Sequence, residues 1–182
     1  MLGQYVTVRA IQEVTSRPNK SYSVRGLASS IGISPAASRT ALEYMKKKGI
    51  VTFAVVGRTY QYKANLESAL CRQWKILFNL DLLEDSRIVK QLAEKISNLQ
   101  SLLLYGSMAR GTNDEKSDVD LLAIAHNPVK VQDLLGKKIG KEVNLMVLSP
   151  SEWKRKAAGD KVFYENVIYD SIALYGERPV VL

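Results

Sequence analysis

Residues 102–124 read LLLYGSMARGTNDEKSDVDLLAI, and their pattern is the most informative part of the second half of the chain. Its apolar start, Leu102–Tyr105, is typical of a buried strand. The strand ends at Gly106, which has no Cβ and lets the backbone approach a bulky anion. A helix is expected to begin next, so that the Ser107 hydroxyl and amide lie where phosphate is favoured. Arg110 follows within one turn and adds positive charge.

The end of the same stretch predicts a second strand, Val119–Ala125, which opens beside two carboxylates. Because side chains alternate along a strand, Asp118 and Asp120 point the same way. Two such carboxylates repel each other unless a cation lies between them, and a site made of oxygen ligands suits Mg²⁺. A phosphate-binding turn beside this pair indicates nucleotide chemistry.

The motif GSMARGTNDEKSDVDLL resembles the nucleotidyltransferase signature of the DNA polymerase β superfamily. It is most similar to the minimal nucleotidyltransferases, relatives of the kanamycin nucleotidyltransferases, over about residues 100–150. The resemblance implies transfer of a nucleoside monophosphate from a nucleoside triphosphate such as ATP, with Mg²⁺ as cofactor and pyrophosphate as product. The implied site comprises Gly106, Ser107 and Arg110 for the nucleotide, and Asp118 and Asp120 for metal binding and catalysis.

The chain departs from the family at the third carboxylate, which members place on a neighbouring strand. The matching segment is Lys141–Met146, and the expected acid falls on Asn144. An amide offers a metal an oxygen, but it brings no charge and cannot act as a base. Glu142 lies two residues earlier on the same strand face and is the alternative third ligand. A weakened or inactive enzyme is the other interpretation.

The remaining pattern of the second half predicts an α/β core on a small mixed sheet. The further elements expected are a strand at Val143–Leu148, a short helix at Val131–Lys138, helices at Ser149–Ala158 and Lys161–Asp170, and a last strand at Ile172–Tyr175.

Positive charge is concentrated in the first third of the chain. Residues 1–63 contain ten Lys or Arg but two acidic residues, a net charge of +8 that equals the net charge of the whole protein. Such asymmetry indicates two modules, of which the basic one faces a polyanion.

The order of elements expected in this first third is helix, short helix, turn, helix and hairpin. The first helix ends near Arg17-Pro18, and the hairpin strands, Val51–Val56 and Thr59–Lys63, join at Gly57-Arg58. This order resembles a winged helix-turn-helix, with VRGLASSIGISPAASRTALEYMKKKGIV as the most telling stretch. The resemblance implies a recognition helix over Ser34–Lys48, a wing tip at Gly57-Arg58, and DNA contacts from Arg39, Lys46 and Arg58.

The expected fold class is therefore α+β, with an N-terminal winged helix-turn-helix and a C-terminal nucleotidyltransferase core. The expected domains are 1–63 for DNA binding, 64–98 as a connector of two helices, and 99–182 for nucleotidyl transfer. With 182 residues, 46% hydrophobic residues, a single cysteine (Cys71) and apolar runs too short to span a bilayer, a cytoplasmic protein is expected.

Two functions compete at this point. The first is a Mg²⁺-dependent nucleotidyltransferase brought to double-stranded DNA by its winged helix. The alternative is a DNA-binding transcriptional regulator whose nucleotidyltransferase-like domain senses a nucleotide or binds a partner protein. The resemblance adds a small helical partner protein and a homodimer to the partners expected.

Overall fold

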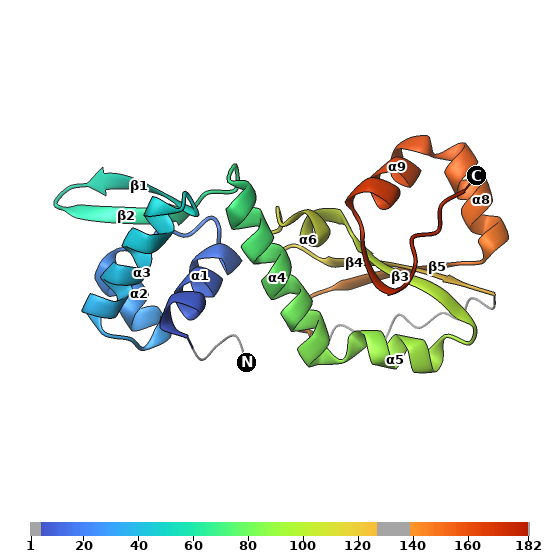
Figure 1. Cartoon of the computed structure of the whole chain (residues 1–182), viewed down its shortest axis with the longest axis horizontal. Coiled ribbons are helices and arrows are strands. Elements are labelled where there is room, and N and C mark those ends of the chain that lie inside the picture. The colour runs from blue at the N-terminus through green and yellow to red at the C-terminus, as the bar shows by residue number, and fades with distance from the viewer. Residues whose placement is uncertain (1–4, 127–138, 182) are drawn as a thin grey trace. The chain divides into compact units, whose positions relative to one another are not determined.

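A computed structural model describes residues 5–126 and 139–181 (Figure 1). The chain divides into two compact units, Met1–Phe78 and Asn79–Leu182. The boundary lies inside α4 (Ala69–Ser86), so the segment expected as a connector contributes to both units. The two helices expected over 65–98 are present as α4 and α5 (Ile88–Lys95).

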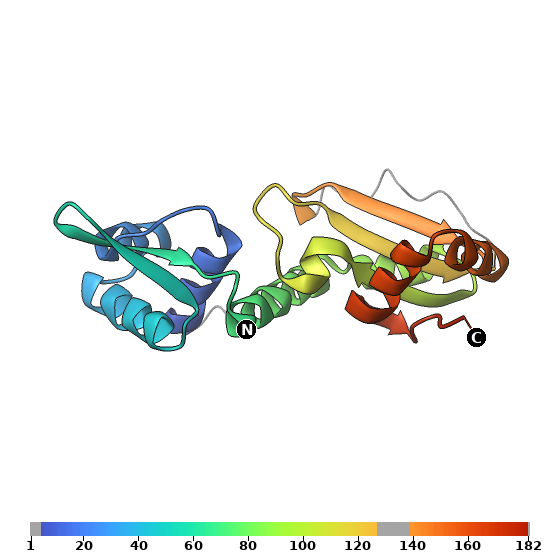
Figure 2. The same cartoon turned by 90° about the horizontal axis from the view of Figure 1, so that it is seen from above.

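The first unit contains three helices followed by a two-stranded antiparallel hairpin. Its elements are α1 (Val6–Ser16), α2 (Val24–Ile31), α3 (Pro35–Lys47), β1 (Val51–Val56) and β2 (Thr59–Ala64), together with the first turns of α4. The strands pair from Val51↔Ala64 to Val56↔Thr59, which places Gly57-Arg58 at the turn as expected. The hairpin extends beyond the helices of its unit (Figure 2).

Local sequence explains where the helices of this unit begin and end. The Ser23 hydroxyl accepts from the Gly26 N–H (3.0 Å), and the Ser34 hydroxyl accepts from the Ala37 N–H (3.1 Å). Both are N-caps, which satisfy backbone donors that have no partner within the helix. Gly32, at φ 65°, ends α2 in the left-handed conformation. The unit is built around one apolar core, formed chiefly by Ala10, Ile11, Val14, Leu27, Leu42, Met45, Ile50, Cys71 and Phe78.

The second unit is built on a four-stranded mixed sheet in the order β5-β4-β3-β6. Strand β3 pairs antiparallel with both β4 and β6, whereas β4 and β5 are parallel. The strands are β3 (Leu99–Tyr105), β4 (Val119–Ala125), β5 (Val143–Leu148) and β6 (Ile172–Gly176). Within the described residues the helices are the end of α4, α5, α6 (Gly106–Arg110), α8 (Pro150–Gly159) and α9 (Lys161–Asp170). The helix expected at Val131–Lys138 lies outside the described residues.

Helices cover both faces of this sheet. Side chains from α4 and α5 pack with Leu102 and Leu104 on one face, while α8 and α9 pack with Leu103 and Leu122 on the other (Figure 1). This division follows from the alternation of side chains along a strand. Because Asp120 has the same parity as Leu122, its side chain belongs to the face that carries α8 and α9.

Candidate functional site

Three neighbouring strands bring the motif residues of the second unit together. Asp120 pairs with Tyr105 on β3 and with Asn144 on β5, so it lies at the centre of a row across the sheet. Asp118 precedes β4 by one residue. The sequence prediction that the two aspartates share a face agrees with their shared contact to Asn144.

Gly106 lies directly against the Asp120 carboxylate. Its φ is 73°, and a Cβ at this position would overlap the Asp120 side-chain oxygen. Both observations favour glycine, since other residues are strained at positive φ and a Cβ here would force the Asp120 carboxylate to move. The sequence predicted that the backbone at Gly106 approaches an anion. In the structure, the anionic group next to Gly106 is the Asp120 carboxylate of the protein itself.

The Asn144 amide bridges the two carboxylates. Its Nδ2 donates to Asp120 Oδ1 (3.2 Å) and to Asp118 Oδ2 (3.4 Å). An amide donor between two carboxylates offsets part of their repulsion, which a third carboxylate could not do. Asn144 is therefore the residue that occupies the position beside both aspartates.

Glu142 contributes its backbone carbonyl to this region. Its carbonyl accepts from the Val119 N–H (2.9 Å), and its side chain is exposed. Among residues 5–126 and 139–181, no three or more His, Cys, Asp or Glu side chains are grouped to hold a metal ion. Among these residues it is the Asn144 amide that hydrogen-bonds to both carboxylates.

The donor set nevertheless fits a hard divalent cation. Asp118 and Asp120 offer oxygens on one face, and rotation of the Asn144 amide presents its oxygen in place of its nitrogen. Mg²⁺ accepts such ligands and commonly takes only one or two carboxylates from the protein, completing its shell with water and phosphate oxygens. The residues present therefore suit Mg²⁺ with a nucleotide phosphate better than a site made of protein ligands alone.

Tyr105 adds a neutral hydroxyl beside this pair. The ring is half-buried and meets Phe163 of α9 edge-on, with ring centroids 5.7 Å apart. Burial, and the negative charge of Asp120, raise the pKa of the Tyr105 phenol. The phenol consequently keeps its proton at physiological pH.

Ser107 and Arg110 lie on the short helix α6, and Arg110 has an acidic partner. Its guanidinium lies 3.7 Å from the Asp170 carboxylate at the end of α9, with both side chains substantially exposed. Sequence reasoning expected this charge to be available to phosphate and missed Asp170. An ion pair between distant elements leaves no local pattern that could have revealed it.

A buried pair of amides fixes the end of α6 to α4 within the second unit. Asn79 Nδ2 donates to the Met108 carbonyl (2.9 Å) and to Asn113 Oδ1 (3.0 Å). Both asparagines are buried. Since buried polar groups are costly without partners, this pair holds the turn after α6 in one place.

The loop that leads into Asp118 closes on itself through Asp114. The Ser117 hydroxyl (2.9 Å) and the Lys116 N–H (3.0 Å) both donate to Asp114 Oδ1. These hydrogen bonds, chiefly that from Ser117, lower the pKa of the Asp114 carboxyl below its usual value, and the charge of Lys141 acts in the same direction.

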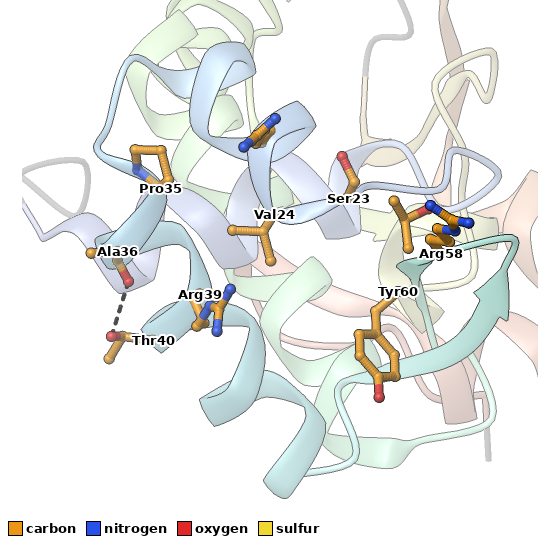
Figure 3. A pocket seen from close by; sticks show the side chains of 10 residues that line it. Ser23, Val24, Pro35, Ala36, Arg39, Thr40, Arg58 and Tyr60 are labelled. Atoms are coloured by element: carbon orange, nitrogen blue, oxygen red, sulfur yellow. Dashed lines mark hydrogen bonds between the residues drawn. The ribbon is translucent and has the colours of Figure 1, made fainter.

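The first unit contains a separate candidate site, a basic groove of about 800 Å³ between its helices and the hairpin. Arginines from three elements line it: Arg25 of α2, Arg39 of α3 and Arg58 of the hairpin turn. Tyr60 of β2 completes one wall, and Figure 3 shows Arg39, Arg58 and Tyr60 around the opening. We call these four residues, with the space between them, the basic groove.

Of the three residues predicted to contact DNA, Arg39 and Arg58 line this groove and Lys46 does not. The Lys46 ammonium instead lies over the Phe53 ring, 3.8 Å from its centroid. Arg25 lines the groove, although sequence reasoning left it out. The position of Arg25 near the start of α2 could have indicated from the sequence that it lines the groove.

Comparisons with known proteins concern both units. Residues 85–170 match the family described as nucleotidyltransferase domain. This match supports nucleotidyl transfer as the general class of chemistry and a nucleoside triphosphate as the class of substrate. No curated protein matches the sequence.

Solved structures with partial similarity include a mutant of the toxin-antitoxin MntA-HpeT, 23% identical over 50% of this chain and 73% of that chain, with a TM-score of 0.41. A putative nucleotidyltransferase from Sulfolobus solfataricus is 21% identical over 65% of this chain and 100% of that chain, with a TM-score of 0.39. A structure that concerns the DNA recognition and protein interaction domains of HOP2 is 18% identical over 34% of this chain and 100% of that chain, with a TM-score of 0.31.

No helix within the described ranges is both long and apolar enough to cross a bilayer.

Proposed function

We propose that the second unit transfers a nucleoside monophosphate from a nucleoside triphosphate to an acceptor, with Asp118 and Asp120 as ligands of Mg²⁺. The observation that carries this proposal is the Asn144 amide that bridges these two carboxylates, with the Gly106 backbone directly against Asp120. The family match over residues 85–170 supports the same class of reaction.

In this reaction a nucleophilic atom of the acceptor attacks the α-phosphorus, and the bond from that phosphorus to the bridging oxygen breaks. Pyrophosphate leaves with the electron pair of that bond. When bound, the cation supplies positive charge beside the phosphate oxygens. Gly106 lets the backbone approach the triphosphate, the Ser107 hydroxyl donates to it, and Arg110 adds charge after it releases Asp170.

The destination of the acceptor's proton depends on Asn144, because this residue has no carboxylate. A carboxylate at this position could accept the proton, but an amide cannot. The proton therefore passes to solvent or to a phosphate oxygen of the substrate. Transfer is expected to be slower than with a third carboxylate, since a positioned base typically contributes about 10²–10⁴-fold.

The test is incubation of the protein with each labelled nucleoside triphosphate, Mg²⁺ and candidate acceptors, which include a small helical protein and RNA. Asp118→Asn and Asp120→Asn should abolish labelling because each removes the negative charge of a cation ligand without changing side-chain shape. Glu115→Gln, an exposed acid of the preceding loop, is the matched control and should label as the wild type does. Persistent labelling in both aspartate variants contradicts the proposed site.

We also propose that the first unit is a winged helix-turn-helix that binds double-stranded DNA through the basic groove, with α3 as the recognition helix and Gly57-Arg58 as the wing tip. Three guanidinium groups from separate elements line one groove, and such clustered positive charge supports this proposal because phosphate contacts dominate the affinity for nucleic acid.

The binding test uses a labelled duplex and a series of salt concentrations. Arg39→Ala and Arg58→Ala should each weaken binding and make the slope of log K against log salt shallower by about 0.9, the value for one lost phosphate contact. Lys154→Ala removes the same charge at an exposed position of the second unit and serves as the control. Absence of binding by the wild type at low salt contradicts the proposal.

A regulator with a weak or inactive transferase unit is the second candidate, and the amide at Asn144 favours it. In that case a nucleoside triphosphate changes the affinity for duplex DNA, while no acceptor is labelled. Measuring duplex binding with and without the nucleotide distinguishes the two functions.

A further inference from the structure

Lys141 is bound to the loop that leads into the candidate site. Its Nζ donates to the carbonyls of Ser117 (2.9 Å), Glu115 (3.0 Å) and Asp114 (3.3 Å). An ammonium group has three N–H donors. All three have partners on one short loop, so this side chain has no donor left for a substrate.

These contacts bracket the backbone of Asp118 on both sides. The Ser117 carbonyl, just before Asp118, accepts from Lys141, and the Val119 N–H, just after it, donates to the Glu142 carbonyl (2.9 Å). Two consecutive residues of the segment before β5 thus hold the two peptide groups that flank Asp118.

The same segment reaches the carboxylates three residues later. Val119 pairs with Val143 in the parallel register, which brings Asn144 beside Asp118 and Asp120. The loop backbone and the carboxylate side chains are therefore both fixed by one stretch, Lys141–Asn144. Displacement of that stretch would move the loop and the amide together.

We propose that Lys141 is a positioning residue that holds loop 114–117 so that the Asp118 carboxylate stays aligned with Asp120 for cation and nucleotide binding. This inference rests on the nucleotidyl transfer proposed above. It extends the site to a residue that touches neither the carboxylates nor the nucleotide.

The experiment compares Lys141→Met, which removes all three donors, with Lys116→Met, which removes an exposed charge from the same loop. Hydrogen exchange in a peptide covering 112–120 should speed up about tenfold or more in Lys141→Met and stay unchanged in the control. Mn²⁺ titrated alone into the protein without nucleotide should bind about 10- to 100-fold more weakly to Lys141→Met, as when an outer-shell partner of a metal ligand is lost.

Steady-state kinetics provides the third readout. Misplacement of one carboxylate by about 1 Å costs about 100-fold in kcat. At saturating Mg²⁺ the KM for the triphosphate should change much less than kcat, because Lys141 acts on the nucleotide only through the cation ligand Asp118. Lys141→Arg retains donors that reach the carbonyls and should restore most of the exchange protection and the Mn²⁺ affinity.

Exchange and Mn²⁺ binding like those of the control would overturn the proposal. If Lys141→Met does not fold, Lys141→Gln, which keeps an amide donor, replaces it with the same expectations. If the wild type labels no acceptor, the proposed reaction fails, yet exchange and Mn²⁺ binding still decide the role of Lys141.

Discussion

The side-chain amide of Asn144 donates to the carboxylate of Asp120 across the parallel pair β4–β5, at 3.2 Å. The same nitrogen lies 3.4 Å from Asp118. The two aspartates are thus bridged by a neutral donor, which offsets part of their mutual repulsion. The same neutral residue limits the negative charge that the site can offer a metal.

Asn144→Asp tests how the residue at position 144 affects cation affinity and stability. A third carboxylate should raise cation affinity about tenfold and increase turnover, since ligand charge governs affinity for hard cations. Without metal the variant should be about 1 kcal/mol less stable, because the added charge faces two carboxylates instead of bridging them. Thermal melts in EDTA and in excess Mg²⁺ measure both effects. Equal melting temperatures of variant and wild type in EDTA would contradict the bridging role.

Gly106→Ala should damage both stability and activity. The substitution carries about 1–2 kcal/mol for left-handed backbone and about 1–3 kcal/mol more for overlap with Asp120. Gly140→Ala is the matched control, because Gly140 has φ 68° but open space around the Cβ position. Denaturant unfolding should therefore show the larger loss for Gly106→Ala. Equal losses would mean that the overlap with Asp120 relaxes freely.

The side-chain pattern of the motif was predictable from sequence, and its contacts with distant segments were not. Alternation alone predicted that Asp118 and Asp120 share a face, and the strand ending at Gly106 was found where expected. The bridge from Asn144 and the contacts of Lys141 depend on the register of β4 against β5. That register is set by packing between segments far apart in sequence, which no local pattern encodes.

The start of strand β3 also depends on pairing with segments that are far apart in sequence. The apolar run predicted a strand from Leu102, but β3 begins at Leu99. Pairing on both edges extends it, since Leu99 lies opposite Ala125 on β4 and Ser101 lies opposite Gly176 on β6. Polar residues such as Gln100 therefore join a strand that their own propensity does not favour.

Asp170→Asn should make Arg110 more available to a triphosphate. The pair is substantially exposed, so its loss is worth about 0.2–1 kcal/mol, equivalent to a fall in KM of about 1.5- to fivefold. Glu165→Gln on the same helix breaks the comparable exposed pair with Lys161 and controls for net charge. If both variants lower KM equally, the effect is one of net charge, and Arg110 has no specific role in it.

Asp114 should make loop 114–117 sensitive to acid. Hydrogen bonds lower the pKa of this carboxyl below its ordinary 3.8, so the folded state favours the charged form. The resulting stability is fully present above about pH 3.8 and is lost as the pH falls through the lower folded-state pKa. The difference in free energy of unfolding between wild type and Asp114→Asn should therefore shrink below pH 3.8. A difference that stays constant with pH would show that the charge of Asp114 is immaterial.

Arg25 should contribute to duplex binding, although it was not among the residues predicted to do so. It lines the basic groove with Arg39 and Arg58, whereas Lys46 lies over Phe53 outside it. Arg25→Ala should therefore weaken duplex binding and make the salt slope shallower by about 0.9. Lys154→Ala, which makes the same change in net charge at an exposed position of the second unit, should leave the slope unchanged. Equal effects of the two variants would mean that the duplex responds to the overall charge of the protein, and that the basic groove is not its binding site.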